Sequence, residues 1–228
     1  MAAKKKAKPK TKLMGKLEIS TPFPTYLGAR QFSGEDIEKL NDRLRLKIYR
    51  NKSENPEGTT RSNTAGTWHS DTGLLTWVDE DDLITMFQKT VYDYLSVYKV
   101  DPTDEVGLKM AAWAMVYNEG GYSTVHTHPN AHFACVYYLD NPPSVEQRMT
   151  TGVRLLPGEI EFVDTRGAQG MLPGTINMGT SFRINPRAGN MLIFPAWLPH
   201  FVHPLVGDKD RICIACNVTI ASHKKGKT

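Results

Sequence analysis

The sequence lacks any apolar run that approaches the roughly 20 residues needed to span a bilayer. Its basic N-terminus is not followed by an apolar segment, which argues against a secretory signal. Cysteine is also scarce, with only Cys135, Cys213 and Cys216. A small, odd number of cysteines argues against a disulfide scaffold and fits a reducing compartment. Together these absences predict a cytoplasmic protein without a membrane partner.

Acidic residues are missing from both ends of the chain, where lysines gather instead. Residues 1–14 are predicted to form a flexible basic arm, and residues 223–228 a basic tail. The lysines concerned are Lys4, Lys5, Lys6, Lys8, Lys10, Lys12, Lys224, Lys225 and Lys227. Without these nine residues the formal net charge changes from +4 to −5. The core therefore does not predict a nucleic-acid groove, and the tails are either simply solvated or able to contact a polyanion.

Residues 15–222 are predicted to form a single domain, long enough to bury a sizeable core. Residues 33–52 have acidic residues early and basic residues late, which is typical of a helix, and residues 79–100 carry apolar residues at helical spacing. Residues 53–71 are rich in Gly, Ser and Asn and are predicted to be a loop. From about residue 106, short β-branched and aromatic runs alternate with turn clusters such as NEGG, which predicts an antiparallel sandwich or barrel.

Cys213 and Cys216 have the CxxC spacing of redox and zinc sites. The surrounding sequence, RICIACNVTI, alternates like a strand, however, and residues three apart on a strand face opposite sides. Both cysteines are therefore interpreted as small buried hydrophobic residues.

Three of the seven histidines lie within the ten residues STVHTHPNAH, residues 123–132. His126 and His128 are two apart, so on an extended strand both side chains point to one face and could hold a metal. His132 follows Pro129 and opens a strand-like run, which favours a loop or strand-start residue, or a substrate contact at the pocket rim, over a metal ligand. Much later, the strand-like MLIFP leads into a Trp/Pro segment that delivers His200, with His203 as a less favoured rival.

Arg211 opens the apolar run that follows His200 and is its only cation. Lys and Arg are rarely buried without a partner. The planar fork of an arginine suits a carboxylate held by two hydrogen bonds, so this position predicts an anion site.

Taken together, the segments RSNTAGTWHSD, HTHPNAHFACVYYLD and FPAWLPHFVHPLVGDKDR resemble those of the Fe(II)- and 2-oxoglutarate-dependent oxygenases. More narrowly, they resemble a branch of this superfamily found among bacteria and phages. The resemblance runs from about residue 15 to the C-terminus. It implies a mainly β fold with flanking helices, the double-stranded β-helix or jelly-roll, cupin-like barrel.

The resemblance also implies roles for individual residues. His126, His128 and His200 would be the metal ligands, and Arg211 would grip the far carboxylate of 2-oxoglutarate. The other candidates are Tyr138 and Tyr117 as partners of that carboxylate, and His132, Asn130 and Trp197 at a substrate pocket.

The implied reaction is the hydroxylation of an organic or peptidyl substrate by dioxygen, coupled to decarboxylation of 2-oxoglutarate to succinate. Fe(II) would be the cofactor, and the protein could be a homodimer. Protein prolyl hydroxylation is the nearest analogy, although a shared fold does not establish a reaction.

His128 is a departure from the family pattern, because most members have Asp or Glu there, completing a triad of two histidines and one carboxylate. Either all three imidazoles bind, or His128 leaves a position open to water or substrate. An all-imidazole site also suits zinc or copper. Two alternatives therefore stay open: a three-histidine dioxygenase that works without 2-oxoglutarate, and a non-catalytic metal-binding β-barrel module.

Overall fold

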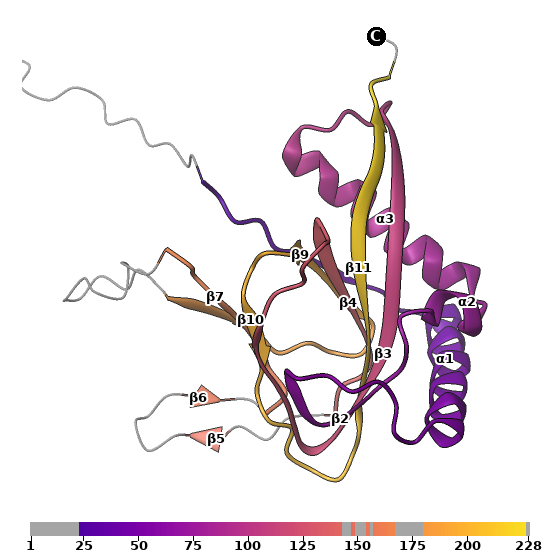
Figure 1. Cartoon of the computed structure of the whole chain (residues 1–228), viewed down its shortest axis with the longest axis vertical. Coiled ribbons are helices and arrows are strands. Elements are labelled where there is room, and N and C mark those ends of the chain that lie inside the picture. The colour runs from indigo at the N-terminus through magenta and orange to yellow at the C-terminus, as the bar shows by residue number, and fades with distance from the viewer. Residues whose placement is uncertain (1–22, 143–146, 149–153, 156, 167–179, 227–228) are drawn as a thin grey trace, which may run out of the picture.

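The computed structural model describes residues 23–142, 147–148, 154–155, 157–166 and 180–226 (Figure 1). The predicted basic arm, residues 1–14, lies outside the described residues. At the other end the last strand continues to Lys224, so the first two residues of the predicted tail belong to a strand.

Both predicted helices are confirmed. Helix α1 spans Glu35–Glu54 and α3 spans Asp81–Leu95, with the short α2 (Leu74–Val78) before α3 and a 3₁₀ turn η1 (Ser96–Tyr98) after it. Helix α1 begins after Gly34, whose φ of 109° is readily adopted only by glycine. Its first turn carries three acidic residues, which interact favourably with the N-terminal end of the helix dipole.

Among the described residues, the strands form one nine-stranded sheet and one separate two-stranded sheet, β5–β6. The order in the large sheet is β1-β9-β4-β11-β3-β10-β7-β8, and β2 pairs with β3 beside this path. The strands are β1 (Gly28–Gln31), β2 (Thr64–His69), β3 (Glu105–His126), β4 (Phe133–Asp140), β5 (Gln147–Arg148), β6 (Arg154–Leu155), β7 (Ile160–Val163), β8 (Ser181–Ile184), β9 (Asn190–Pro195), β10 (His200–Val202) and β11 (Arg211–Lys224).

Two details of the sequence prediction are wrong. The segment expected to be a loop, residues 53–71, contains β2. Its Gly- and Thr-rich sequence does not predict a strand, and pairing with β3 is what makes it one. The NEGG cluster does not end a strand either. Strand β3 runs through it, with Gly120 at a positive φ of 74° and a shift in the register with β2.

The sheet has two buried faces, because successive strand residues point to opposite sides. One face packs against the helices, including the predicted apolar stripe of α3, all of whose members are buried. The other face lines the inside of the curled sheet. Cys216 belongs to the helix-covered core and Cys213 to the inner core, as their spacing predicts, and neither forms a disulfide.

The mainly β jelly-roll prediction is confirmed by this curled antiparallel sheet with helices on its outer side (Figure 1). Within the described residues, no helix has both the length and the apolar character that crossing a membrane requires.

Candidate metal centre and cosubstrate pocket

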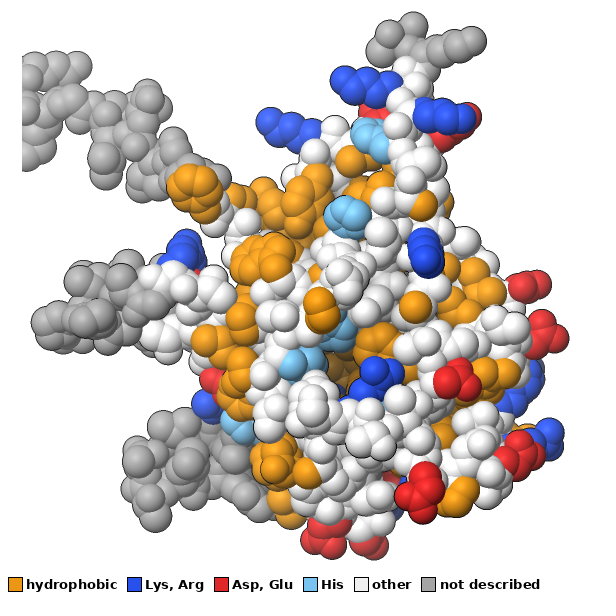
Figure 2. All heavy atoms as spheres, in the orientation of Figure 1, with side chains coloured by type: hydrophobic (Ala, Val, Ile, Leu, Met, Phe, Trp, Pro, Cys, Tyr) orange, Lys and Arg blue, Asp and Glu red, His pale blue; other side chains and the backbone are white. Residues whose placement is uncertain are grey.

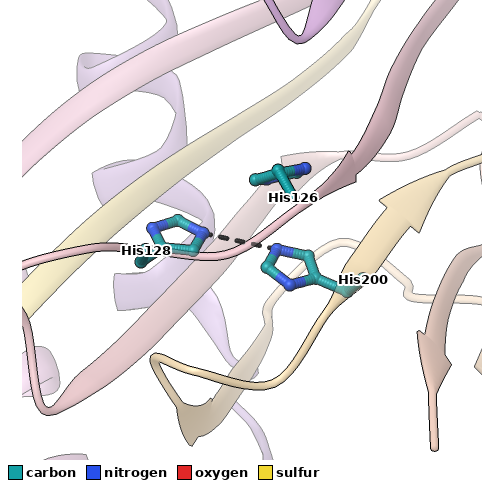
Figure 3. A group of neighbouring side chains, drawn as sticks. All are labelled: His126, His128 and His200. Atoms are coloured by element: carbon teal, nitrogen blue, oxygen red, sulfur yellow. Dashed lines mark hydrogen bonds between the residues drawn. The ribbon is translucent and has the colours of Figure 1, made fainter. Parts of the chain in front are cut away.

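The structure brings the three predicted histidines together at one edge of the inner face (Figure 3). His126 ends β3 and lies opposite His200, which begins β10. His128 follows outside the strand, where its backbone N–H donates to the carbonyl of Ala196 over 2.9 Å. The potential ligand atoms of the three side chains all lie within 4.8 Å of one another.

Each of the three imidazoles has its Nδ1 atom occupied. The Nδ1 atoms of His126 and His200 donate to the backbone carbonyls of Thr124 and Leu198, over 2.7 and 2.9 Å. The Nδ1 atom of His128 lies 2.7 Å from Oδ1 of Asn217. Because a neutral imidazole carries one proton, these contacts place it on Nδ1 and leave the Nε2 lone pair free, which is how metal-binding histidines are commonly oriented.

Two of these free Nε2 atoms face each other. Nε2 of His128 lies 3.3 Å from Nε2 of His200, the contact dashed in Figure 3. Two nitrogens bound to one metal at about 2.1 Å are about 3.0 to 3.4 Å apart for bond angles of roughly 90° to 110°. The group therefore fits a metal ion, which would resolve the repulsion between two facing lone pairs.

Burial also holds these side chains in the neutral form that binds metals. It lowers the pKa of His128 to about 4 and that of His200 to about 3, and it lowers the pKa of His126. Metal ions compete with protons for imidazole nitrogen, so a lowered pKa favours metal binding at neutral pH.

Arg211 is only 1% exposed and has buried nitrogens, Nε and Nη1, with no hydrogen-bond partner. Its guanidinium carbon lies 4.8 Å from the ring centroid of Tyr117 and 5.0 Å from that of Tyr138. Within the described residues no carboxylate pairs with it. Burying a cation without a paired anion costs several kcal/mol of folding free energy. Such a cost is expected where an anionic ligand pairs with the cation when it binds.

The two predicted tyrosines flank this arginine. The hydroxyl of Tyr138 is buried without a hydrogen-bond partner, whereas that of Tyr117 lies 2.8 Å from Oγ of Ser123. Burial raises the pKa of Tyr117 to about 12 and raises that of Tyr138 further, so both hydroxyls keep their protons. Tyr138 therefore offers a free O–H donor beside the guanidinium.

A cavity of about 530 Å³ joins the three histidines to the arginine and the two tyrosines. This volume is within the usual range of small-molecule sites, roughly 300–1,000 Å³. Figure 2 shows a hollow near the middle of one face, with histidine and basic side chains around it. The cavity thus has the composition that a metal and a dicarboxylate require.

Other predicted site residues lie elsewhere. His132 and Asn130 are exposed and do not line this cavity: Nδ1 of His132 accepts from the backbone N–H of Ile220, and Asn130 sits in a turn at φ 63°. Trp197 is 54% exposed and lines a separate apolar groove. His203 contacts Glu161, with 2.7 Å between Nε2 and Oε2, and is not part of the histidine group.

Sequence reasoning gave too little weight to Asn217, Arg61 and His69. An asparagine near the end of a strand is usually part of a turn. Asn217 nevertheless shares strand parity with Arg211, which places it on the inner face beside His128. Arg61 and His69 line the cavity from the segment that was expected to be a loop.

Comparison with known proteins finds a family model that matches the part of the chain that holds the site. Residues 111–217 match the family model described as "Putative 2OG-Fe(II) oxygenase", and this region contains the three histidines, the arginine and both tyrosines. The matched region is that of a 2-oxoglutarate- and Fe(II)-dependent oxygenase. Fe(II) and 2-oxoglutarate are the cofactor and cosubstrate of this family, which makes the chain an oxidoreductase. A search of the curated proteins gave no significant match.

Solved structures share the fold of this oxygenase. A prolyl-4-hydroxylase of Pseudomonas putida is 14% identical, with 87% of this chain and 94% of that chain covered and a TM-score of 0.54. HygX from Streptomyces hygroscopicus, solved with nickel and 2-oxoglutarate, is 11% identical over 86% and 83%, with a TM-score of 0.51. SnoK, an alpha-ketoglutarate-dependent carbocyclase from nogalamycin biosynthesis, is 9% identical over 89% and 82%, with a TM-score of 0.57.

Proposed function

We propose that the protein hydroxylates a C–H bond of its substrate, with one atom of dioxygen entering the alcohol and the other entering succinate. The second product of 2-oxoglutarate is then carbon dioxide, so atoms and electrons balance. The observation that carries this proposal is that Arg211, buried with two unpartnered nitrogens, shares a cavity with three histidines whose potential ligand atoms lie within 4.8 Å of one another.

We assign the metal to His126, His128 and His200. When bound, Fe(II) supplies the redox chemistry that activates dioxygen, which amino-acid side chains cannot provide. The chain's own contribution is to fix the three ring orientations through Thr124, Leu198 and Asn217.

We assign the far carboxylate of 2-oxoglutarate to Arg211. The guanidinium has two buried nitrogens to donate, and the Tyr138 hydroxyl adds a third donor on the same side of the cavity. The aromatic faces of Tyr117 and Tyr138 exclude water from this end, which strengthens the charge-assisted hydrogen bonds. The keto acid end then points toward the histidines.

A three-histidine dioxygenase that works without 2-oxoglutarate is the second candidate, favoured by the imidazole of His128 where the usual triad has a carboxylate. In that case Arg211 would hold a carboxylate of the substrate itself.

One experiment separates the two. The Fe(II)-loaded protein is given 2-oxoglutarate and dioxygen, and succinate is measured together with oxygen consumption. Succinate formation that depends on Fe(II), with cosubstrate binding lost in Arg211→Ala, supports the first function. Cosubstrate binding that Arg211→Ala leaves unchanged would contradict the assignment of Arg211, and oxygen uptake without succinate would favour the second candidate.

A further inference from the structure

A second basic group, Arg61, enters the cavity from the segment before β2. Its guanidinium carbon lies 5.6 Å from the ring centroid of Trp113, which also lines the cavity. The Nε atom of Arg61 is buried and has no hydrogen-bond partner. No carboxylate pairs with this arginine anywhere in the part of the chain that the structure describes. The guanidinium therefore lies against the indole ring of Trp113 while its Nε–H has no acceptor.

His69, at the end of β2, is a second polar side chain without a partner. It lies opposite Met115 of β3, and both residues line the cavity, so the register of the two strands turns this histidine inward. It is only 4% exposed, and both of its ring nitrogens are buried without a hydrogen-bond partner. Buried polar atoms of this kind cost free energy unless something pairs with them.

His69 and Arg61 line the same cavity and are close enough for the charge of Arg61 to affect His69. Burial, followed by the positive charge of Arg61, lowers the pKa of His69 to about 4, so its ring is neutral at pH 7. A neutral ring offers one N–H donor next to the guanidinium. Neither residue is needed to orient the three metal-binding histidines, whose Nδ1 atoms already have acceptors.

The charge balance of the cavity points in the same direction. None of the described residues that line it is Asp or Glu. A divalent metal and Arg211 together exceed the two negative charges of 2-oxoglutarate by one, because His128 contributes no carboxylate. Arg61 raises this excess to two. Uncompensated positive charge in a partly closed cavity attracts an anion.

We propose that Arg61 and His69 form a substrate subsite that binds an anionic oxygen group, a carboxylate or a phosphate, of the molecule to be hydroxylated. This inference rests on the proposed function, since it takes 2-oxoglutarate to occupy the Arg211 end of the cavity. The planar fork of Arg61 suits either anion, and the neutral ring of His69 adds a hydrogen bond to the same group. The substrate is thus anchored on the β2 side of the histidine group, with its reactive carbon toward the metal.

The test uses the full-length protein loaded with Zn(II), which is diamagnetic, and saturated with 2-oxoglutarate. The Nε–Hε resonance of Arg61 is followed by nuclear magnetic resonance while three probes are added. N-acetylglycine carries a carboxylate, N-acetylglycinamide is its neutral match, and methyl phosphate carries the other anion. We expect an anionic probe to shift this resonance and the neutral amide to leave it unchanged, and the tighter of the two anions identifies the group.

Two variants test whether the anion binds through Arg61. Because Arg61→Gln removes the reporting resonance, calorimetry measures binding to each variant. Arg61→Gln should weaken binding of the anionic probe roughly ten- to hundred-fold and leave the affinity for 2-oxoglutarate unchanged. Arg50→Gln removes an equal charge from an exposed position on α1 and should change neither affinity. Thermal unfolding of each variant shows whether it is folded.

Three outcomes discriminate. If neither anion shifts the Arg61 resonance, the subsite is overturned. If Arg61→Gln weakens the binding of 2-oxoglutarate as much as the binding of the probe, Arg61 belongs to the cosubstrate pocket and the inference is also wrong. If the anion shifts Arg61 but 2-oxoglutarate does not bind, the anion site stands and the proposed function fails.

Discussion

Nε2 of His128 faces Nε2 of His200 at 3.3 Å, although the Nδ1 atom of each ring is already engaged by another residue. Neutral imidazoles in this arrangement present two lone pairs to each other. A divalent cation between them would replace this repulsion by two coordinate bonds, so a bound metal should stabilise this arrangement of the rings.

Metal binding should stabilise the folded protein. At a free metal concentration about 100 times Kd, the free energy of unfolding should rise by about 2.7 kcal/mol. His200→Ala should lose most of this gain, because only two of the three ligands would remain to bind the metal. His223→Ala, which removes an exposed histidine paired with Asp104, should keep it. Thermal unfolding with and without Ni(II) measures the difference, and an equal gain in both variants would contradict the assignment.

Asn217→Ala should weaken metal binding without removing a ligand. Its Oδ1 atom lies 2.7 Å from Nδ1 of His128 and fixes both the tautomer and the ring orientation. Loss of such an orienting partner typically costs about 10- to 100-fold in metal affinity. Asn118→Ala removes an exposed asparagine that donates to Asp210 and serves as the matched control. Competition with a metal chelator gives both affinities, and equal values in the two variants would count against this role.

Arg211→Met should separate stability from ligand binding. The buried guanidinium has no anion in the free protein, so an apolar side chain of similar length should leave the free energy of unfolding unchanged or raise it by about 1–3 kcal/mol. Binding of 2-oxoglutarate, measured by calorimetry, should disappear in the same variant. Clear destabilisation of the ligand-free protein would show that Arg211 has a structural partner instead.

Glu80 should make stability depend on pH. Hydrogen bonds from Arg43, together with those from Lys47, hold the pKa of Glu80 below its usual value. A carboxyl whose pKa is depressed in the folded state contributes stability above its unfolded pKa, near 4.3, and loses it as the pH falls through the folded pKa. Glu80→Gln should therefore cost about 1 kcal/mol at pH 7 and progressively less below about pH 4.

The comparison for Glu80 is Glu35, which forms an exposed pair with Lys39 one helical turn away. Glu35→Gln should change stability by only a few tenths of a kcal/mol, because water screens such pairs. Urea unfolding at several pH values checks both variants. A pH-independent cost of Glu80→Gln would show that packing, and not charge, explains it.

Strand alternation and helical spacing predicted most of the architecture, since burial on one or two faces leaves a periodic trace in the sequence. The helix over Asp81–Leu95 and the opposite placement of Cys213 and Cys216 are confirmed for this reason. Strand β2 was missed because its order comes from pairing with β3, a long-range contact that short polar residues do not reveal.

The candidate site was predictable where one residue type is out of place among its neighbours. Arg211 in an apolar strand and the closely spaced histidines were conspicuous, and the structure brings them to one cavity. Arg61 was not conspicuous, because polar residues are ordinary in a Gly- and Ser-rich segment, and the same sequence context explains His69 equally well by packing against the barrel. Both residues have buried nitrogen atoms without a hydrogen-bond partner, a property that only the three-dimensional contacts can show.

Strand β11 carries Arg211 at its first residue and Asn217 six residues later, both on the inner face. The backbone between them is paired on both sides, with β3 and β4, so their separation cannot change without breaking the sheet. Under the proposed assignment, the strand fixes the distance between Arg211, which would bind the far carboxylate, and Asn217, which contacts His128. We expect the protein to select its dicarboxylate by length, binding 2-oxoglutarate well and 2-oxoadipate, one methylene longer, poorly.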